Sequence, residues 1–379
     1  MTPLADLITR RIAKTGPMTL ADYMTDCLLH PAHGYYATRD PLGRQGDFTT
    51  APEISQMFGE LLGLCLAQSW LDQGAPDTFT LAEPGPGRGT LMADIWRATA
   101  GVPGFHAAAQ IHLIEASPVL REVQGEALRG LPVTWADTVE ALPEDRPLFL
   151  IANEFFDALP IRQFQRDGNG WREVVVALNE GALTLALTEP TPLADLQHRL
   201  ADTEDGYIVE TRAAATPLMA AINRRIARQG GAAVIIDYGD WRSHGDTFQA
   251  LEDHAFADPL ANPGNADLTA HVDFEALRHA APDLTASALM PQGALLAALG
   301  IEARAARLAE RLTGAALENH VKAFERLTQP QEMGTLFKAL ALVAPGSPLP
   351  PGFAPHVSPA TPAPATPAPD APTPDEPRS

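Results

Sequence analysis

A glycine-rich turn preceded by an acid is the first segment of this chain whose residue types could do chemistry. In the run LAEPGPGRGT, Glu83 ends an apolar stretch, and Gly85, Gly87 and Gly89 follow at every second position. Glycines permit a tight turn and let a ligand approach the backbone, and the start of the helix expected next favours a negative group. A nicotinamide fingerprint needs glycine three residues after Gly87, where threonine stands, whereas a strand-end acid suits the amino group of a methionine moiety. The alternative is a purely structural turn.

Two further acids follow the next two expected strands. The strand Gln110–Ile114 is followed by Glu115, whose carboxylate can accept hydrogen bonds from both hydroxyls of a ribose. The strand Val133–Trp135 is followed by Asp137, where an acid can hold the exocyclic amine of adenine. One such acid alone is more often a solvated strand end or a helix cap. Three at successive strand ends, beginning with Glu83, predict a site for an adenosyl cofactor, S-adenosyl-L-methionine.

The segment after the next expected strand carries the candidate reaction centre. Strand Leu148–Ala152 is followed by NEFFDALP, which places Asn153, Glu154 and Asp157 at the carboxyl end of a strand, where sheets wound this way bind ligands. A carboxylate can pair bidentately with a guanidinium and concentrate electron density on the attacking nitrogen. Methyl transfer by direct displacement then needs mainly alignment of nitrogen, methyl carbon and sulfur. The alternative interpretation makes Glu154 and Asp157 helix caps.

Histidines and threonines elsewhere give weaker signals. The run GDFTTAPE is typical of a loop that enters a helix, with Thr49 as a simple cap. His271 stands alone between apolar positions, so a hydrogen-bonded core histidine is the default and a proton-handling role the alternative. His30 and His33 lack the spacing of metal ligands, and we expect no metal site.

Short apolar runs alternate with helical patterns, which predicts parallel strands joined by helices. Strands are expected at 78–82, 110–114, 133–135, 148–152, 232–237, 284–290 and 336–343. They predict an α/β, Rossmann-like fold with a seven-stranded mixed sheet and helices on both faces. Two more runs, Arg172–Leu178 and Ala182–Leu187, flank the turn Asn179-Glu180-Gly181 and predict an inserted β-hairpin.

Pattern and composition divide the chain into three expected parts. Residues 1–75 form a helical extension that covers the active site, and 76–344 form the main domain with insertions near 161–205 and 240–275. Residues 345–379 hold 13 of the 35 prolines, interleaved with alanine, threonine and serine. Proline fixes φ and removes a donor, and such a segment has little to bury, so we expect a disordered tail.

The charge balance bears on the partner. Asp plus Glu total 47 against 27 Lys plus Arg, a formal net charge of −20. This surface repels phosphate backbones, so we expect no nucleic-acid partner, whereas a basic polypeptide or a small cation fits. The alternative is that the acidity serves only solubility. No apolar run is long enough to predict a membrane span.

The cysteines and the N-terminal residues bear on location. The two cysteines lack metal spacing, and Cys65 lies in an apolar helical run typical of a reduced core thiol. The first residues show no secretory signal. Arg10, Arg11 and Lys14 could belong to an organellar presequence, but Asp6 and the early globular pattern count against one. We therefore expect a bacterial cytoplasmic location rather than a mitochondrial one.

Several segments resemble the MidA-like methyltransferase family, in the same order along the chain. They are HP with GYY at 30–36, GDFTTAPEISQ at 46–56, the glycine turn at 83–90, NEFFDALP at 153–160, IDYG at 236–239, the stretch 264–274 and MGTLFK at 333–338. The resemblance spans about residues 1–343. It implies a class I methyltransferase fold, S-adenosyl-L-methionine as the methyl donor and a protein arginine as the acceptor. The family includes a mitochondrial complex I assembly factor that methylates an arginine.

The resemblance also implies roles for single residues. Asp47 and Thr49 would close over the cofactor, and the three glycines would form its turn. Glu154 and Asp157 belong to NEFFDALP at 153–160, which would hold the methyl acceptor and which we call the acceptor segment. Pro84 stands where we expect an aliphatic residue. Because proline has no N–H, one backbone contact is lost there, but the turn should survive.

The leading hypothesis is therefore a protein arginine N-methyltransferase that acts on a subunit of respiratory complex I during assembly, the subunit with the quinone-site arginine. The alternatives are a small-molecule methyltransferase and a non-catalytic assembly factor that binds the cofactor as a structural element. The glycine spacing disfavours an NAD-dependent oxidoreductase. The apolar faces of helices expected at 303–312 and 315–327 could pack on the sheet or on a second subunit, which leaves a homodimer open.

Overall fold

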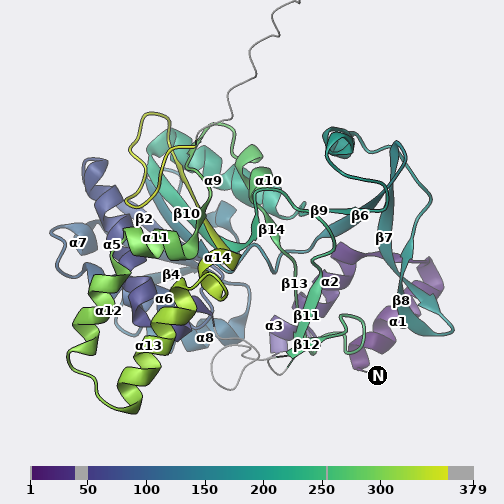
Figure 1. The fold of residues 1–379 in the computed structure, drawn as a ribbon, viewed down its shortest axis with the longest axis horizontal. Coiled ribbons are helices and arrows are strands. Elements are labelled where there is room, and N and C mark those ends of the chain that lie inside the picture. The colour runs from purple at the N-terminus through teal and green to yellow at the C-terminus, as the bar shows by residue number, and fades with distance from the viewer. Residues whose placement is uncertain (1, 39–49, 253–254, 357–379) are drawn as a thin grey trace, which may run out of the picture.

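The computed structural model describes residues 2–38, 50–252 and 255–356, which are arranged around a central mixed β-sheet (Figure 1). Its strands are Phe79–Pro84 (β2), Ala109–Ile114 (β3), Val133–Ala136 (β4), Leu148–Asn153 (β5), Gly231–Asp240 (β10), Val272–Asp273 (β14), Thr285–Ala286 (β15), Met290–Pro291 (β16) and Phe337–Val343 (β17). Among the described residues the order is β15-β17-β10-β5-β2-β3-β4, with β14 beside β10 and β16 beside β17. β2, β3, β4, β5 and β10 are parallel, and β17 is antiparallel to β10. The expected mixed sheet is confirmed, although the strand expected at 284–290 is broken into β15 and β16.

Alternate residues of the central strands pack into two hydrophobic cores, one on each face of the sheet. In β10, Val234 and Ile236 belong to the first core, and Ala233 and Ile235 to the second. The first core is covered by Gln56–Asp72 (α5), Thr90–Thr99 (α6), Phe105–Ala108 (α7), Gln292–Ala298 (α11), Ile301–Ala309 (α12), Ala315–Thr328 (α13) and Met333–Leu336 (α14). The second core is covered by the 3₁₀ turn Val139–Ala141 (η1), Ala215–Gln229 (α9) and Phe274–His279 (α10). A further helix, Pro118–Ala127 (α8), follows β3 in the sequence. Helices therefore lie on both faces, as expected.

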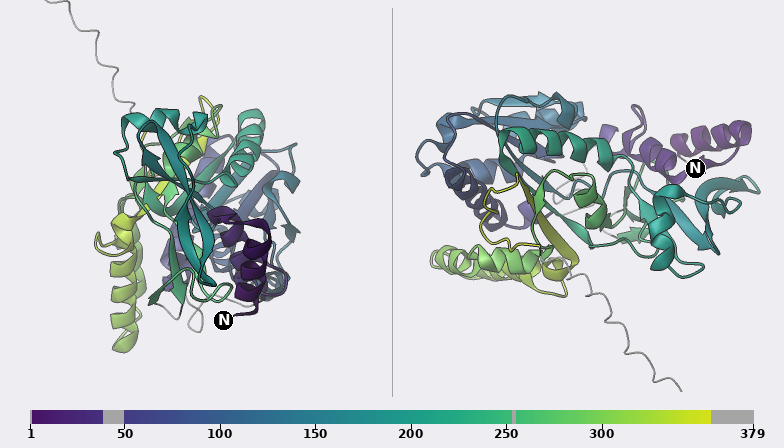
Figure 2. Two further views of the ribbon diagram at one scale, coloured as in Figure 1. Left: turned by 90° about the vertical axis from the view of Figure 1, so that its right-hand side faces the viewer. Right: turned by 90° about the horizontal axis from the view of Figure 1, so that it is seen from above.

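A second sheet combines the expected hairpin with N-terminal segments. Its strands are Met18–Thr19 (β1), Arg162–Asp167 (β6), Gly170–Asn179 (β7), Ala182–Leu187 (β8) and Ile208–Thr211 (β9). β7 and β8 pair antiparallel, which confirms the hairpin, but the order β1-β7-β6-β9 makes it part of a larger sheet. Helices Pro3–Thr15 (α1) and Leu20–Leu29 (α2) pack on this sheet through Ile8, Met24 and Val176. Figure 2 shows this unit to one side of the central sheet.

A third, small sheet lies beside the central sheet and the second sheet. It consists of Gln249–Glu252 (β11), Ala255–Ala257 (β12) and Asp267–Thr269 (β13), in the order β12-β11-β13. Ala250 and Leu268 are buried in the same core as α1 and α2. The two short helices Tyr35–Thr38 (α3) and Ala51–Ile54 (α4) lie on either side of residues 39–49, which are outside the described part of the chain.

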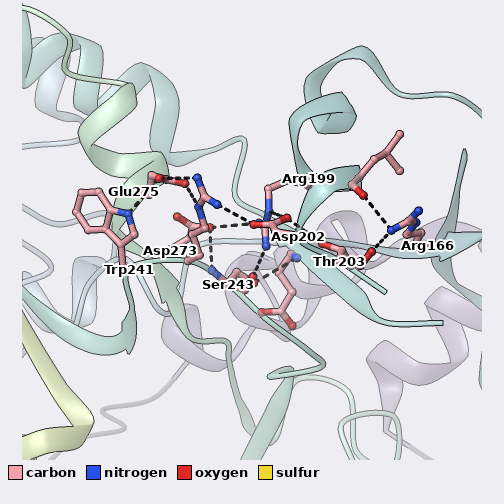
Figure 3. A network of polar contacts seen from close by, with 11 residues as sticks. Arg166, Arg199, Asp202, Thr203, Trp241, Ser243, Asp273 and Glu275 are labelled. Carbon is pink, nitrogen blue, oxygen red and sulfur yellow. Dashed lines mark hydrogen bonds and ion pairs between the residues drawn. The ribbon is translucent and has the colours of Figure 1, made fainter. Parts of the chain in front are cut away.

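A polar network ties the second sheet to the central one (Figure 3). Arg199, from the 3₁₀ segment Ala194–Ala201 (η2), donates to the Ser243 carbonyl (2.8 Å) and pairs with Asp202 (3.1 Å). The Ser243 N–H donates to Asp273 (2.9 Å), whose other oxygen accepts the Ala276 N–H (2.8 Å) at the start of α10. Because Arg199 and Ser243 are 44 positions apart and Ser243 and Asp273 are 30 apart, these contacts fix one sheet against the other.

The expectation that the chain becomes disordered from Pro345 is wrong for residues 345–356. Leu349 and Phe353 pack against the first core, and the Ala288 N–H donates to the Ala354 carbonyl (2.8 Å). The reason is that these two side chains give the segment apolar surface to bury. Residues 357–379 lie outside the described residues, and the division of the chain at 75 and 344 into separate units stays a prediction. In the part of the chain that is described, no helix has the length and apolar character needed to cross a membrane.

Candidate active site

A cavity of ≈ 1290 Å³ opens at the carboxyl ends of β2, β3, β5 and β10. Doubly wound sheets bind their ligands at this edge. Of the residues predicted from the sequence, those in its wall are Glu83, Gly85, Gly87, Glu115, Asp137, Asn153, Glu154, Asp157 and His271. Gly89 stands next to the cavity as the N-cap of α6, and Asp47 and Thr49 lie outside the described residues. The fold thus gathers candidates that are far apart in the sequence.

The glycine turn has the backbone conformation that only glycine adopts readily. Gly85, Gly87 and Gly89 have φ values of 61°, 55° and 83°. The Gly85 N–H donates to the Ile114 carbonyl (2.9 Å), so β2 stays paired with β3 up to the turn. The turn therefore forms despite Pro84, as expected.

Glu83 presents an unsatisfied acceptor at this turn. Its side chain is buried, and its Oε2 has no hydrogen-bond partner among the described residues. Burial raises the pKa of Glu83 to about 8, and an N–H of Met92 lowers it in part. A buried polar atom without a partner is costly, and a cationic amino group would satisfy it. This orphaned oxygen fits the amino group of a methionine moiety.

Glu115 is preorganised by the residues around it. It is buried at the end of β3, where its Oε1 accepts the Ser117 N–H (2.8 Å) and its Oε2 accepts the Gln124 amide (3.2 Å). Gln124 also donates to the Gly87 carbonyl (2.8 Å), so one side chain links the glycine turn to Glu115. Burial raises the pKa of Glu115, and these N–H donors lower it in part. Sequence reasoning missed Gln124, because nothing in its helix distinguishes it from a surface glutamine.

Asp137 reaches the cavity but stays largely in solvent. Its side chain is 85% exposed and pairs with Arg121 at 2.6 Å. The side chain can therefore contact an adenine only at the edge of the cavity.

Glu154 is held in the left-handed region at the end of β5, with φ 50°, a conformation that is rare for residues other than glycine. Its N–H donates to the Ile236 carbonyl (2.9 Å), so pairing with β10 continues to this residue before the chain turns. Its Oε1 accepts the Asn153 amide (2.9 Å) and the Ala51 N–H (3.0 Å) of α4. Burial raises the pKa of Glu154 to about 7, with Ala51 lowering it and the nearby Asp157 raising it.

Asp237 shapes the turn that carries Glu154 and Asp157. It is fully buried in β10, and its Oδ2 accepts three successive N–H groups, from Phe155 (3.2 Å), Phe156 (3.0 Å) and Asp157 (3.2 Å). Burial and the neighbouring carboxylates raise the pKa of Asp237 well above its usual range, and Arg212 lowers it in part. Sequence reasoning did not assign this residue a role. The available signal was an acid directly after an apolar strand run, because a buried acid needs several partners.

Arg212 supplies positive charge to the same cluster. It donates to the Leu159 carbonyl (3.2 Å) and the Ala270 carbonyl (2.9 Å), which ties the acceptor segment to the loop after β13. Burial raises the pKa of Asp157, and a hydrogen bond from Tyr238 and the charge of Arg212 lower it in part. Sequence reasoning missed Arg212 as well, since its role depends on loops distant in the sequence.

His271 lies in the cavity wall rather than in a core. Its ring packs edge-on against Tyr238, with centroids 5.3 Å apart. Burial, Lys338 and Arg212 lower the pKa of His271, which keeps it neutral at pH 7. Its proton-handling role stays a prediction. Among the described residues no group of three or more His, Cys, Asp or Glu side chains is arranged to hold a metal ion.

Solved structures share this architecture. A protein from Burkholderia thailandensis bound to S-adenosyl-homocysteine has a TM-score of 0.78 and 30% identity, with 92% of this chain and 93% of that chain covered. A second, native crystal structure from Burkholderia thailandensis has a TM-score of 0.76 and 29% identity, with the same shares of both chains covered.

Relatives are also found among characterised sequences. One is the protein arginine methyltransferase NDUFAF7, mitochondrial, of Danio rerio, 37% identical over 363 residues, 89% of this chain and 86% of that protein. The protein of the same name in Homo sapiens is 36% identical over 374 residues, 90% and 84% respectively. These mitochondrial relatives contradict the expected cytoplasmic location. The physical reason is that cysteine content reports only a reducing environment, whereas targeting signals decide the compartment.

A family model of S-adenosyl-L-methionine-dependent methyltransferases matches residues 61–292. This range contains the glycine turn, Glu115 and the acceptor segment, and the orphaned Glu83 oxygen fits the cofactor of that family. S-adenosyl-L-methionine is therefore the cofactor of this enzyme. On sequence, fold and site together, the chain belongs to this family of S-adenosyl-L-methionine-dependent methyltransferases.

Proposed function

We propose that the chain is a protein arginine N-methyltransferase that acts on a subunit of respiratory complex I during its assembly. The observation that carries the proposal is the pair Glu154 and Asp157, two carboxylates in the cavity wall beside the cofactor turn. Relatives named protein arginine methyltransferases support it. Two acids held by a common turn can bind the planar guanidinium group from one side.

The chemistry follows from this placement. Bound S-adenosyl-L-methionine supplies an electrophilic methyl group on a sulfonium. The carboxylates of Glu154 and Asp157 orient the guanidinium, so that a nitrogen–carbon bond forms as the carbon–sulfur bond breaks. The nitrogen must also lose a proton, and Glu154, with a pKa of about 7, is suited to accept it. Asn153 Oδ1, buried and without a partner among the described residues, offers one more acceptor for a guanidinium N–H.

The activity should depend on pH through Glu154. Because this carboxyl must be ionised to bind the guanidinium and take its proton, kcat/KM should rise with pH through about 7 and be lost below it. The measurement is the rate of methyl transfer against pH at saturating cofactor, which removes any contribution from the titration of Glu83. A kcat/KM that stays constant through this pH would contradict the assignment.

Glu83→Gln should weaken cofactor binding. The variant keeps the size of the side chain but loses the charge that faces the amino group. We expect the Kd for S-adenosyl-homocysteine to rise about 10- to 100-fold, as for the loss of a hydrogen bond between charged groups. Isothermal titration calorimetry measures this Kd. Glu122→Gln is the control, because the Glu122 side chain is exposed on α8. Equal affinity of Glu83→Gln and the unchanged protein would exclude the contact.

The proposal is tested by methyl transfer to the complex I subunit that carries the quinone-site arginine. Enzyme, labelled S-adenosyl-L-methionine and that subunit are incubated, and the modified residue is found by peptide mass mapping. Methyl groups on one arginine support the proposal. Label on a different residue type, or none despite measured cofactor binding, would contradict it. Size-exclusion chromatography with light scattering on the same preparation tests whether the chain forms a homodimer.

A further inference from the structure

Three large apolar side chains stand exposed in the wall of the active-site cavity. Leu29 at the end of α2 is 49% exposed, Phe256 of β12 is 78% exposed and Leu336 of α14 is 48% exposed. All three line the cavity. A side chain that lines a cavity and is also about half exposed lies where the cavity opens, so these three residues form an apolar part of its edge. We call them the apolar rim.

The apolar rim differs in chemistry from other residues in the wall of the same cavity. The cavity wall also contains Glu154 and Asp157, whose carboxylates form the polar acceptor end. Each rim residue comes from a separate element, and the three elements belong to the N-terminal helices, the third sheet and the segment before β17. The cavity edge also carries the exposed charged side chains of Asp137, Glu140 and Arg326, so the apolar rim is one part of that edge.

Leaving such side chains in water is unfavourable. Burial of a leucine or phenylalanine side chain removes a large apolar surface from water, which is favourable. Clusters of exposed apolar residues on soluble proteins mark binding surfaces. In this chain of net charge −20, three exposed apolar side chains in the wall of a cavity that also contains two carboxylates are complementary to a ligand with one cation flanked by apolar groups.

We propose that the apolar rim binds apolar side chains on both sides of the acceptor arginine, and so selects a polypeptide in an extended, not yet folded state. This inference rests on the proposed function. An arginine side chain inserted toward Glu154 leaves its neighbouring residues at the opening, where Leu29, Phe256 and Leu336 can cover them. Apolar residues are mostly buried in folded proteins, so an arginine with apolar neighbours on both sides is accessible chiefly before folding or assembly.

The test compares two synthetic nine-residue peptides, each with one central arginine. Two leucines flank the arginine on each side in the first peptide and two serines in the second, and all other positions are identical. We expect kcat/KM for the leucine peptide to exceed that for the serine peptide by about tenfold or more. The reason is that burial of leucine side chains against the apolar rim outweighs the entropy lost when the peptide is ordered.

Variants of the apolar rim test whether its side chains cause the preference for the leucine peptide. In Phe256→Ser and Leu336→Ser the ratio of the two kcat/KM values should fall toward one. Leu185→Ser serves as the matched control, because Leu185 on β8 is 42% exposed and is not among the residues that line the cavity. Circular dichroism confirms that each variant is folded.

The outcomes separate the two proposals. Methylation of both peptides at equal rates would overturn the role of the rim and leave arginine methylation standing. Methylation of neither peptide would overturn both. A raised Kd for S-adenosyl-homocysteine in the rim variants, with an unchanged peptide ratio, would show that the rim covers the cofactor instead and would overturn the inference.

Discussion

Glu154→Gln should lower kcat for methyl transfer by about 10²- to 10³-fold, a usual effect of removing a charge that acts on the reacting atoms. Glutamine keeps the size and the Oε1 acceptor, so the contacts with the Asn153 amide and the Ala51 N–H can persist. What it loses is the negative charge and the ability to take a proton. The variant should therefore bind S-adenosyl-homocysteine with a Kd within about twofold of the unchanged protein, since only the acceptor half of the site differs.

The measurement is single-turnover methyl transfer together with calorimetric cofactor binding. Glu180→Gln is a matched control, because Glu180 has the same φ of 50° but lies at the exposed turn between β7 and β8. It should leave both quantities unchanged. Methyl transfer by Glu154→Gln at the rate of the control would remove Glu154 from the mechanism and favour a non-catalytic role for the site.

Asp237→Ala should be strongly destabilising and inactive. The substitution leaves the N–H groups of Phe155, Phe156 and Asp157 without their common acceptor. We expect the free energy of unfolding to fall by about 3–5 kcal/mol, as for other buried charged groups that lose a partner. Without the carboxylate, the turn that follows Glu154 loses the common acceptor of its N–H groups, so the positions of Glu154 and Asp157 should shift and methyl transfer should fall by at least about 10²-fold even in the folded fraction.

Urea unfolding and activity under folding conditions measure the two effects. Asp240→Ala, at the exposed end of the same strand, is the control, because its carboxylate accepts the N–H of its neighbour Trp241 (2.7 Å) and does not hold the turn after Glu154. Asp237→Asn separates charge from shape: its amide oxygen can still accept N–H groups, so more stability should return than activity. An Asp237→Ala variant as stable and active as the control would show that the turn forms without this side chain.

Much of the cofactor half of the site could be predicted from the sequence because it depends on local rules. The glycine turn follows from three glycines between an apolar run and a helix, and their positive φ values confirm it. The placement of Glu83 and Glu115 follows from a general property of parallel sheets, whose carboxyl ends share one edge. The hairpin β7–β8 was likewise set by a short turn sequence between two apolar runs.

Two structural expectations were wrong, and both failed where a long-range contact decided the structure. The start of the tail was placed too early, because Leu349 and Phe353 find apolar partners in a core built from residues far earlier in the chain. The strand expected at 284–290 was broken into two short pieces against β17. The cytoplasmic location failed for a different reason, since it was inferred from the cysteines and from the residue types of the N-terminal segment and did not depend on a tertiary contact.

The sequence by itself determined the class of fold, the glycine turn and the position of Asn153, Glu154 and Asp157 at the end of a strand, because strand periodicity and glycine spacing act over a few residues. Only the tertiary structure decided how the acceptor segment is held. Asp237 lies 80 to 82 positions from the N–H groups that it accepts, and Arg212 lies 53 and 58 positions from the carbonyls to which it donates. No local pattern encodes such pairs, because the cost of burying their charges is offset only when the folded chain brings the partners together.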